Sequence, residues 1–319
     1  MIKMKIGVSS CLLGTNCRYD GAGSKDGFVV NELSKYFDLV PFCPEAIVFG
    51  TPRESIRLVE IEGQVRVISN KAQKDVTEEL ETISKTLAQK AFEDNLCGFI
   101  FKAKSPSCGI ERVKLYQHNS NMCEKKAVGV FAKEVTDKQP FLPIEEDGRL
   151  NDPWLKENFL MQIFAYKELK LFLENNPSFK DLVDFHTSYK YLIYAKSQES
   201  YKKLGGIVAN HKKRNIADVL SDYTPAFLDA IGKKGNINKT YNVLLHIFGY
   251  FKKLINTEEK EHILTACQEY KDGIIPLIAV IKLLNLYVKR FDDSYLKTQK
   301  FLNPYPKELA LRSDIKAYK

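Results

Sequence analysis

The sequence has no long hydrophobic run. Its longest apolar stretch of helical length, residues 274–288, is interrupted by a proline, a lysine and an asparagine, whereas a membrane-spanning helix needs about 18 or more uninterrupted apolar residues. The N-terminus is basic and then apolar, but its apolar run passes directly into Gly14 and Asn16, so it predicts a first strand and loop and not a signal peptide. We therefore expect a cytoplasmic protein with no membrane contact.

The sequence also has no pair of cysteines separated by two residues. Its seven cysteines lie at positions 11, 17, 43, 97, 108, 123 and 267. This spacing excludes a zinc ribbon, a ferredoxin run and a thioredoxin-like redox pair. Because the number is odd and the cysteines are spread widely, thiols or metal ligands are favoured over disulfides in a cytoplasmic chain.

The first half of the sequence has no surplus of positive charge, and the whole surplus lies in the second half. Residues 1–150 hold 21 Lys and Arg against 21 Asp and Glu, whereas residues 151–319 hold 27 against 19, so the net charge of +8 lies beyond residue 150. A basic half is typical of proteins that meet a polyanion such as nucleic acid, although a surplus of this size also serves solubility.

The first half alternates short apolar strands with helices. Strands are predicted at 4–10, 39–42, 56–60, 64–69, 97–102 and 128–131, and helices at 27–36 and 76–95. Asp75 and Glu78 have the spacing of a capping box for the second of these helices. The alternation predicts a Rossmann-like α/β domain over residues 1–148, with a mostly parallel sheet.

The pattern becomes helical beyond a polar segment at 136–153, which we interpret as a linker or as a strand end that leads into a second domain. Helical spacing covers residues 154–175, 181–211, 214–231, 238–256, 258–272 and 276–300. His246 stands in an apolar stripe and is expected to be a core or capping residue and not a ligand. Residues 149–319 are predicted to form an all-α domain. Nothing in the sequence fixes the oligomeric state.

Three cysteines, Cys11, Cys43 and Cys108, each follow the end of a predicted strand. In open α/β sheets, sites form at the carboxyl edge of the strands, so these distant cysteines are expected to meet there. Three thiolates suit a catalytic zinc with water as the fourth ligand, or a 4Fe-4S cluster whose fourth iron binds substrate. Their spacing does not decide between the two.

Polar residues beside two of these cysteines supply further chemistry. Glu45, two residues beyond the second cysteine, is a candidate acid or base. In the run KAKSPSCG at 102–109, the hydroxyls of Ser105 and Ser107 are candidate donors to a substrate or cluster. The lysines of the run, Lys102 and Lys104, are candidate contacts to phosphate.

Residues 186–214 interleave basic residues with tyrosines. Lys190, Tyr194 and Tyr201 fall near one face at helical spacing, which suits phosphate contacts and base stacking. An ordinary solvated helix with core tyrosines is the alternative. The candidate RNA contacts are Lys190, Lys202, Lys203, Lys212, Lys213 and Arg214, and the segment also contains His186, Tyr189, Tyr191 and Lys196.

Three separated motifs resemble the TudS-type thiouracil desulfidase family. They are GVSSCLLGTNCRYDG at 7–21, CPE at 43–45 with the PRE and IRLV runs before residue 60, and FKAKSPSCG at 101–109. The resemblance implies a 4Fe-4S cluster in which one iron has no protein ligand. The residues that it implies are Cys11, Cys43 and Cys108 as ligands, and Glu45 and Ser105 in catalysis.

Cys17 departs from the pattern of that family, which usually has an aliphatic residue at this position. A thiol there is able to compete as a ligand, but we expect Cys17 to be a bystander. The resemblance covers about residues 4–145.

The second half resembles the YbgA-type helical domain in segments at 186–210, 241–253, 270–284 and 295–312. The fused arrangement is similar to RudS-type desulfidases, which remove sulfur from 4-thiouridine in tRNA. This resemblance implies that the helical domain presents the tRNA and that the α/β domain converts 4-thiouracil to uracil and sulfide without net electron transfer.

In the expected mechanism, the free iron binds the exocyclic sulfur and polarises the C–S bond. Glu45 takes a proton from the attacking water and later returns it, and Ser105 holds the base edge or the tetrahedral oxygen. Two alternatives stay open. The chain acts on free thiouracil or thiolated nucleosides with the helical domain used for assembly, or it is a non-enzymatic metal-containing RNA-binding protein.

Overall fold

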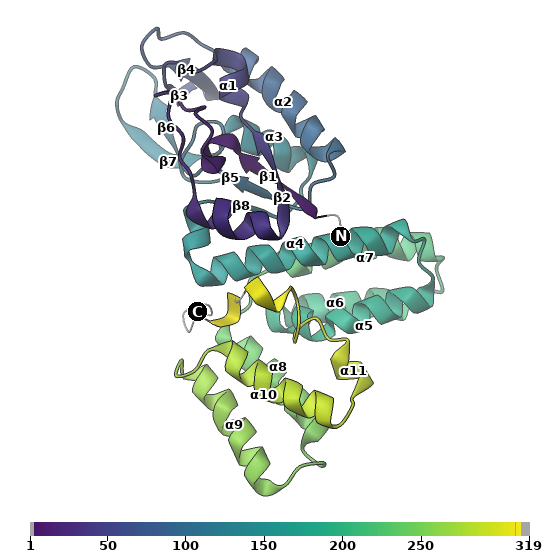
Figure 1. Cartoon of the computed structure of the whole chain (residues 1–319). Helices are drawn as coiled ribbons and strands as arrows, with labels where there is room; N and C mark the ends of the chain where they lie inside the picture. Colours follow the sequence, from purple (N-terminus) through teal and green to yellow (C-terminus); the bar gives the residue numbers. More distant parts are fainter. Residues whose placement is uncertain (1–2, 310, 314–319) are drawn as a thin grey trace. The chain divides into compact units, whose positions relative to one another are not determined.

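A computed structural model describes residues 3–309 and 311–313 of the chain, which divides into two units, Met1–Asn151 and Asp152–Lys319 (Figure 1). The first unit contains two sheets with helices, and the second is helical. The predicted class, an α/β domain followed by an all-α domain, is confirmed.

Sheet A is the parallel sheet of the first unit. It consists of β1 (Met4–Ser9), β2 (Phe37–Phe42), β5 (Phe99–Phe101) and β8 (Ile144–Glu146), in the order β2-β1-β5-β8. Its pairings are all parallel, so the segments that follow β2, β1 and β5 emerge at one edge of the sheet. Because β8 lies within residues 136–153, that segment is a strand end and not only a linker.

Sheet B is mixed. It consists of β3 (Ile56–Ile61), β4 (Gln64–Ser69), β6 (Val113–Gln117) and β7 (Cys123–Ala127), in the order β4-β3-β6-β7. The antiparallel β3–β4 hairpin was predictable from its apolar runs. The strands β6 and β7 were not predicted, because β7 reads CEKKA and exposes its first four residues, which leaves almost no apolar signal.

The helices of the first unit differ in detail from the prediction. They are η1 (Ser10–Leu13), η2 (Phe28–Glu32), η3 (Leu33–Lys35), α1 (Pro44–Phe49), α2 (Thr77–Glu93), α3 (Val130–Lys138) and η4 (Arg149–Asn151). The predicted helix at 27–36 is a π turn followed by a 3-10 turn. The predicted capping box of α2 is wrong, because the Asp75 carboxylate accepts from the Thr77 amide at 3.0 Å and α2 begins at Thr77.

The predicted strand at 128–131 is also wrong, because these residues begin α3. The amides of Val130 and Phe131 donate to the carbonyls of Pro106 (3.1 Å) and Ser107 (2.8 Å). A Cβ at Gly129 would lie 2.5 Å from the carbonyl carbon of Ser107, so glycine permits this close contact. The start of α3 thus fixes the loop that follows β5.

Phe131 also completes the aromatic core below that loop. Its ring centroid lies 5.6 Å from that of Phe99, 5.8 Å from that of Phe101 and 6.1 Å from that of Phe42. These residues belong to α3, β5 and β2, and they are almost fully buried. In the sequence, the apolar residues at this buried start of a helix therefore have the same pattern as a short buried strand.

The second unit consists of helices packed on one core. They are α4 (Pro153–Glu174), α5 (Phe179–Lys196), α6 (Gln198–Ala209), α7 (Ile216–Gly232), α8 (Ile237–Phe251), α9 (Thr257–Lys271), α10 (Leu277–Arg290), α11 (Ser294–Lys297), η5 (Lys307–Leu309) and η6 (Leu311–Ser313). The predicted helix at 181–211 is divided at Ser197, whose side chain accepts from the Ser200 amide at 3.2 Å and begins a new helix. The predicted helix at 276–300 is divided in the same way by Asp293, which caps α11.

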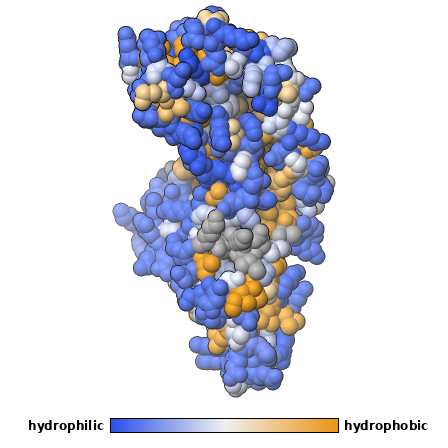
Figure 2. Space-filling model, turned by 90° about the vertical axis from the view of Figure 1, so that its left-hand side faces the viewer, coloured by the Kyte–Doolittle hydropathy of each residue, from blue (hydrophilic) through white to orange (hydrophobic). Residues whose placement is uncertain are grey.

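Within the described residues, no helix combines the length and the apolar character that crossing a membrane requires. The face of the molecule in Figure 2 is mostly hydrophilic, and its hydrophobic side chains form small separate groups.

Candidate functional site

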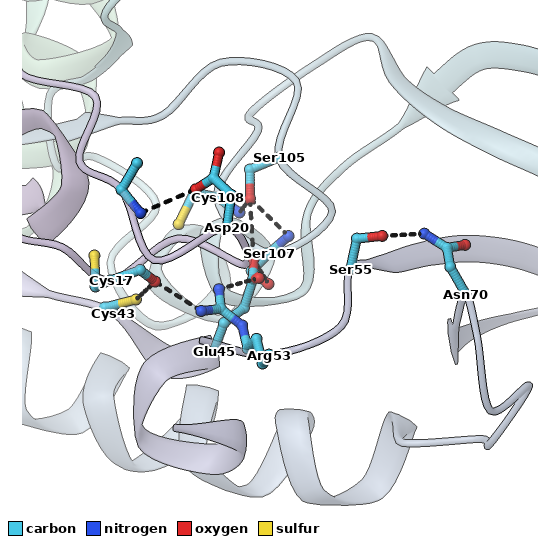
Figure 3. A network of polar contacts seen from close by, with 11 residues as sticks. Cys17, Asp20, Cys43, Glu45, Arg53, Ser55, Asn70, Ser105, Ser107 and Cys108 are labelled. Carbon is cyan, nitrogen blue, oxygen red and sulfur yellow. Dashed lines mark hydrogen bonds and ion pairs between the residues drawn. The ribbon is translucent and has the colours of Figure 1, made fainter. Parts of the chain in front are cut away.

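Four cysteines line one cavity of about 260 Å³ at the carboxyl edge of sheet A. Cys11 lies in η1 directly after β1, and Cys43 is the N-cap of α1 directly after β2. Cys108 lies in the loop that follows β5. The three cysteines at strand ends therefore do meet, as the strand order requires, and Cys17 lies with them. Figure 3 shows Cys17, Cys43 and Cys108.

Neighbouring cysteines and burial raise the pKa values of three of these thiols. The neighbouring Cys11 raises the pKa of Cys17 to about 11. The contact with Cys17, together with burial, raises the pKa of Cys43 far above its usual range. Burial raises the pKa of Cys108. Cys17, Cys43 and Cys108 are therefore protonated at neutral pH unless a bound cation displaces the protons.

The loop that carries Cys17 is tied back to the rest of the site. Gly14, in the left-handed region with φ 89°, ends η1. Beyond it, the amide of Ser24 donates to the carbonyl of Cys11 at 2.8 Å. The guanidinium Nη1 of Arg53 donates to the carbonyl of Cys17 at 2.7 Å. These contacts fix the position of Cys17 in the cavity.

Glu45, in the first turn of α1, is the centre of a polar network (Figure 3). Its Oε1 accepts from the hydroxyl of Ser107 at 2.7 Å and from that of Ser105 at 3.3 Å. Its Oε2 pairs with Nη2 of Arg53 at 2.6 Å, and the two side chains are 15% and 5% exposed. Water screens this buried pair little, so the loss of either charge would leave the other charge buried and uncompensated.

Arg53 is the functional residue that the sequence reasoning did not single out. It stands in the PRE run at 52–54, which carries part of the resemblance, but no local spacing links it to Glu45 or to Cys17. Its guanidinium bridges the two, through the contacts to the Glu45 carboxylate and to the Cys17 carbonyl. The signal in the sequence that could have identified Arg53 was its position in the PRE motif.

The two serines of the SPSCG run have different positions. Ser107 is fully buried, and its hydroxyl lies behind Glu45. Ser105 lines the cavity, and its Oγ accepts from the amides of Ser107 (3.2 Å) and Cys108 (3.1 Å). Ser105 is thus placed to face a bound molecule, whereas Ser107 orients the carboxylate.

Lys102 and Lys104 also line the cavity. The ammonium group of Lys102 is paired with the carboxylate of Asp147, which follows β8 and also accepts from the Ala103 amide at 2.8 Å. Lys104 is exposed. The charge of Lys102 is therefore largely balanced, and Lys104 supplies positive charge at the rim.

The donor set fits an iron–sulfur cluster. Thiolates are the usual ligands of such clusters. Across residues 3–309 and 311–313, no three or more His, Cys, Asp and Glu side chains are grouped around a single metal-ion position. The cysteines of a 4Fe-4S cluster bind different irons and lie further apart than the ligands of one ion. Cys11, Cys43 and Cys108 line one cavity from three different segments, which suits ligands of different irons.

In the second unit, the basic candidates lie on α5, on α6 and in the loop before α7. The ammonium of Lys190 lies 5.9 Å from the ring centroid of Tyr201, which makes an edge contact with Tyr194 at 5.3 Å. This places the three residues on one face, as predicted. The remaining candidates are the exposed Lys202, Lys203, Lys212 and Lys213, and Arg214, which pairs with Asp222 at 2.6 Å.

Several other members of the segment 186–214 are not on the surface. Tyr189 and Tyr191 are buried. The ammonium of Lys196 is buried against Oδ1 of Asn158 at 2.9 Å and the carbonyl of Lys233 at 2.8 Å, and burial lowers its pKa to about 7. These residues stabilise the helical core and are unavailable to a nucleic acid.

The structure places His186 in the core and His246 at the surface. His186 is buried, with its ring 3.2 Å from the hydroxyl of Tyr223, and burial lowers its pKa to about 4. His246 is exposed and makes an edge contact with Tyr194 at 5.4 Å. The expectation that His246 is a core or capping residue is wrong, because its position in the stripe lies at the solvent edge of α8.

Two family models match the chain. Residues 6–147 match the family described as 2-thiouracil desulfurase. Residues 190–306 match a family of proteins of unknown function, DUF1722. These matches confirm the resemblance of the α/β domain to thiouracil desulfidases.

Two curated relatives each correspond to one half of the chain. The uncharacterized protein YbgA of Escherichia coli K12 is 30% identical over 157 residues, which are 49% of this chain and 93% of YbgA. The uncharacterized protein YbbK of Bacillus subtilis 168 is 32% identical over 153 residues, which are 46% of this chain and 97% of YbbK. Among solved structures, the 4Fe-4S-dependent thiouracil desulfidase TudS is 23% identical, with a TM-score of 0.37, over 47% of this chain and 94% of TudS.

Proposed function

We infer that the chain is a desulfidase of a thiolated pyrimidine, because it belongs through residues 6–147 to the 2-thiouracil desulfurase family. The observation that carries this inference is one cavity that holds the cysteine thiols, the Glu45 carboxylate and the Ser105 hydroxyl. Desulfidation needs a soft site for sulfur and a proton acceptor for water, and both are present in that cavity.

Cys11, Cys43 and Cys108 are the proposed ligands of a 4Fe-4S cluster. They line the cavity from the ends of β1, β2 and β5. When bound, a 4Fe-4S cluster held by three cysteines supplies a soft Lewis acid, which prefers a thiocarbonyl sulfur to a carbonyl oxygen.

Glu45 is the proposed general base. It accepts a proton from the water that attacks the thiocarbonyl carbon, and it returns that proton to the departing sulfur or to the ring nitrogen. Water and thiouracil thus give uracil and hydrogen sulfide without an oxidant or a reductant. Ser107 and Arg53 hold the two carboxylate oxygens at 2.7 and 2.6 Å, so the base is oriented before substrate enters.

Ser105 is the proposed donor to the substrate. Its Oγ already accepts two amides and its hydroxyl proton points to Glu45 over a long 3.3 Å bond. A long bond is readily exchanged for one to a substrate oxygen or ring atom. Ser105 therefore positions the base edge, with Lys104 at the rim available to a nearby phosphate.

The proposed substrate is 4-thiouridine in tRNA, in the cytoplasm. The net charge of +8 lies in residues 151–319, and the face of Lys190, Tyr194 and Tyr201 combines a cation with aromatic rings. Such a combination suits a phosphate contact beside a stacked base. All seven cysteines are free thiols, which suits a reducing compartment.

Competition between substrates tests this proposal. Anaerobically reconstituted protein is offered thiolated tRNA or free 4-thiouracil, and sulfide release is measured across a range of salt concentrations. We expect a higher kcat/KM for the tRNA, falling steeply with salt because phosphate contacts release counterions.

The matched variants are Lys202→Glu/Lys203→Glu and, as a control of equal charge change, Lys282→Glu/Lys289→Glu on α10, all four residues being exposed. The first pair is expected to lower turnover of tRNA more than turnover of the free base and to reduce the salt slope by roughly one per lost contact. If both double variants turned over tRNA and the free base in the same ratio as the wild type does, the tRNA proposal would be contradicted and a desulfidase of free thiouracil would be favoured.

A further inference from the structure

The cavity contains one thiol more than the proposed cluster requires. Cys17 is buried, at 6% exposed, and lines the same cavity as Cys11, Cys43 and Cys108. A cysteine is nearly the size of the aliphatic residue that the resemblance leads one to expect at this position. The substitution therefore changes the chemistry of the cavity more than its volume.

Cys17 shares its cavity with the other three cysteines. The Cys43 sulfur lies 3.9 Å from the Cys17 carbonyl, so the two residues are direct neighbours. Four sulfurs around one cavity are the complete donor set of a 4Fe-4S cluster in which every iron has a cysteine ligand.

The surroundings of Cys17 tie it to the catalytic side of the cavity. Arg53 donates to the Cys17 carbonyl at 2.7 Å and to the Glu45 carboxylate at 2.6 Å. A single side chain therefore holds both the backbone of Cys17 and the carboxylate of the proposed base. Cys17 and Glu45 line the same cavity, which the sulfur of the substrate must also enter.

We propose that Cys17 is a fourth, exchangeable thiolate ligand of the cluster held by Cys11, Cys43 and Cys108, and that the substrate sulfur displaces it. The proposal rests on the proposed function. In the absence of substrate, a fourth thiolate protects the iron that would otherwise be open to water and oxygen. On binding of substrate, one iron–thiolate bond would be exchanged for one bond to the thiocarbonyl sulfur, and the released Cys17 thiolate would take up a proton from solvent, with no change of oxidation state.

Mössbauer spectroscopy tests this ligand directly, without reference to turnover. Wild-type protein and Cys17→Val are reconstituted anaerobically with Mössbauer-active iron, and Cys123→Ser, in the exposed strand β7, is the control. We expect the irons of the wild type and the control to be alike, and one iron of Cys17→Val to differ from the other three. Addition of 4-thiouracil to the wild type should make one iron distinct.

Oxidative loss of iron is the second measurement. After a brief exposure to air, Cys17→Val is expected to lose one iron per cluster faster than the wild type and the Cys123→Ser control. Because Cys17 no longer competes with the substrate for the cluster, the variant should also show a lower KM for 4-thiouracil.

The outcomes separate the two proposals. A wild-type cluster in which one iron is already distinct without substrate, with equal air sensitivity in Cys17→Val, would overturn the role of Cys17 and leave the desulfidase proposal intact. Failure of wild-type and variant protein alike to assemble any cluster would overturn the proposed function itself.

Discussion

The carboxylate of Glu45 has two separable roles, and Glu45→Gln followed by a double variant distinguishes them. Glutamine keeps the size of the side chain and an oxygen that can accept from Ser107, but it cannot accept a proton from water. General base catalysis typically contributes about 10²–10⁴-fold. We therefore expect kcat to fall by that factor, which corresponds to about 3–5 kcal/mol of transition-state stabilisation.

The same substitution also breaks an ion pair. Arg53 is left with a buried charge, because its side chain is only 5% exposed. Removing one partner of a buried pair costs about 3–5 kcal/mol, and the lower end applies here since the Glu45 side chain, 15% exposed, lines a cavity. The free energy of unfolding of the first unit should fall by about 3 kcal/mol.

The double variant Glu45→Gln/Arg53→Met removes both charges. Most of the lost stability should return, because replacing both partners by groups of similar volume is close to neutral. Recovery stays incomplete, since Arg53 also holds the Cys17 carbonyl. Activity should stay low in the double variant, because the base is still missing.

Two assays decide the matter. Urea denaturation followed by circular dichroism gives the free energy of unfolding, and anaerobic sulfide release from 4-thiouracil, divided by the iron content, gives turnover per cluster. Wild-type turnover in Glu45→Gln with full iron content would refute the role of Glu45 as base. Restored turnover in the double variant would show that Glu45→Gln had acted only through the uncompensated charge of Arg53.

The remaining predictions concern the serines, pH and iron. Ser107→Ala removes a 2.7 Å bond to a carboxylate and should lower the free energy of unfolding by about 1.5–3 kcal/mol. Ser105→Ala, at a residue that faces the cavity, should lower sulfide release more than it lowers stability. A larger loss of stability in Ser105→Ala and a larger loss of sulfide release in Ser107→Ala would contradict these assignments. Because burial lowers the pKa of His186 to about 4 from 6.5, the unfolded chain binds the extra proton between these values, so stability should decrease as the pH falls from 6.5 to 4. His186→Gln should flatten that decrease in urea titrations at each pH, and an unchanged slope would exclude His186 as its source. Removal of iron by a chelator should abolish sulfide release and visible absorbance but preserve the helical circular dichroism, since the second unit has its own core; loss of that signal would disprove the independence of the core.

The parts of the fold that were predictable have a periodic apolar signal. The strand β1 is a short apolar run that ends in small residues, and β2 contains the apolar run that ends directly before Cys43. The strand order then brings Cys11, Cys43 and Cys108 to one edge. Each cysteine could be placed from its own segment. No contact between distant segments had to be known.

The parts that were missed depend on tertiary contacts. The CEKKA strand is polar because it is exposed, and it is a strand only because it pairs with β6. The VGVF run starts a helix because its amides find the carbonyls of the loop after β5. Arg53 meets Glu45 across the turn that joins α1 to β3, which no propensity or period describes.

The thiol of Cys17 illustrates the same limit at the site. Its loop position and its departure from the motif were visible in the sequence, and both favoured a bystander. Its place in the cavity with Cys11 and Cys43 follows from the folding of the loop 14–27 onto η1. An extra cysteine in a motif is therefore assessed better by where the fold places it than by its absence from relatives.

The stoichiometry of anaerobic desulfidation tests the central claim most directly. Reconstituted protein is incubated with 4-thiouracil and no reductant, and uracil and sulfide are quantified together with iron and acid-labile sulfide. The account predicts equal amounts of uracil and sulfide, formed over many turnovers in proportion to a cluster of about four irons per chain. Unchanged 4-thiouracil in the presence of a full cluster would contradict it.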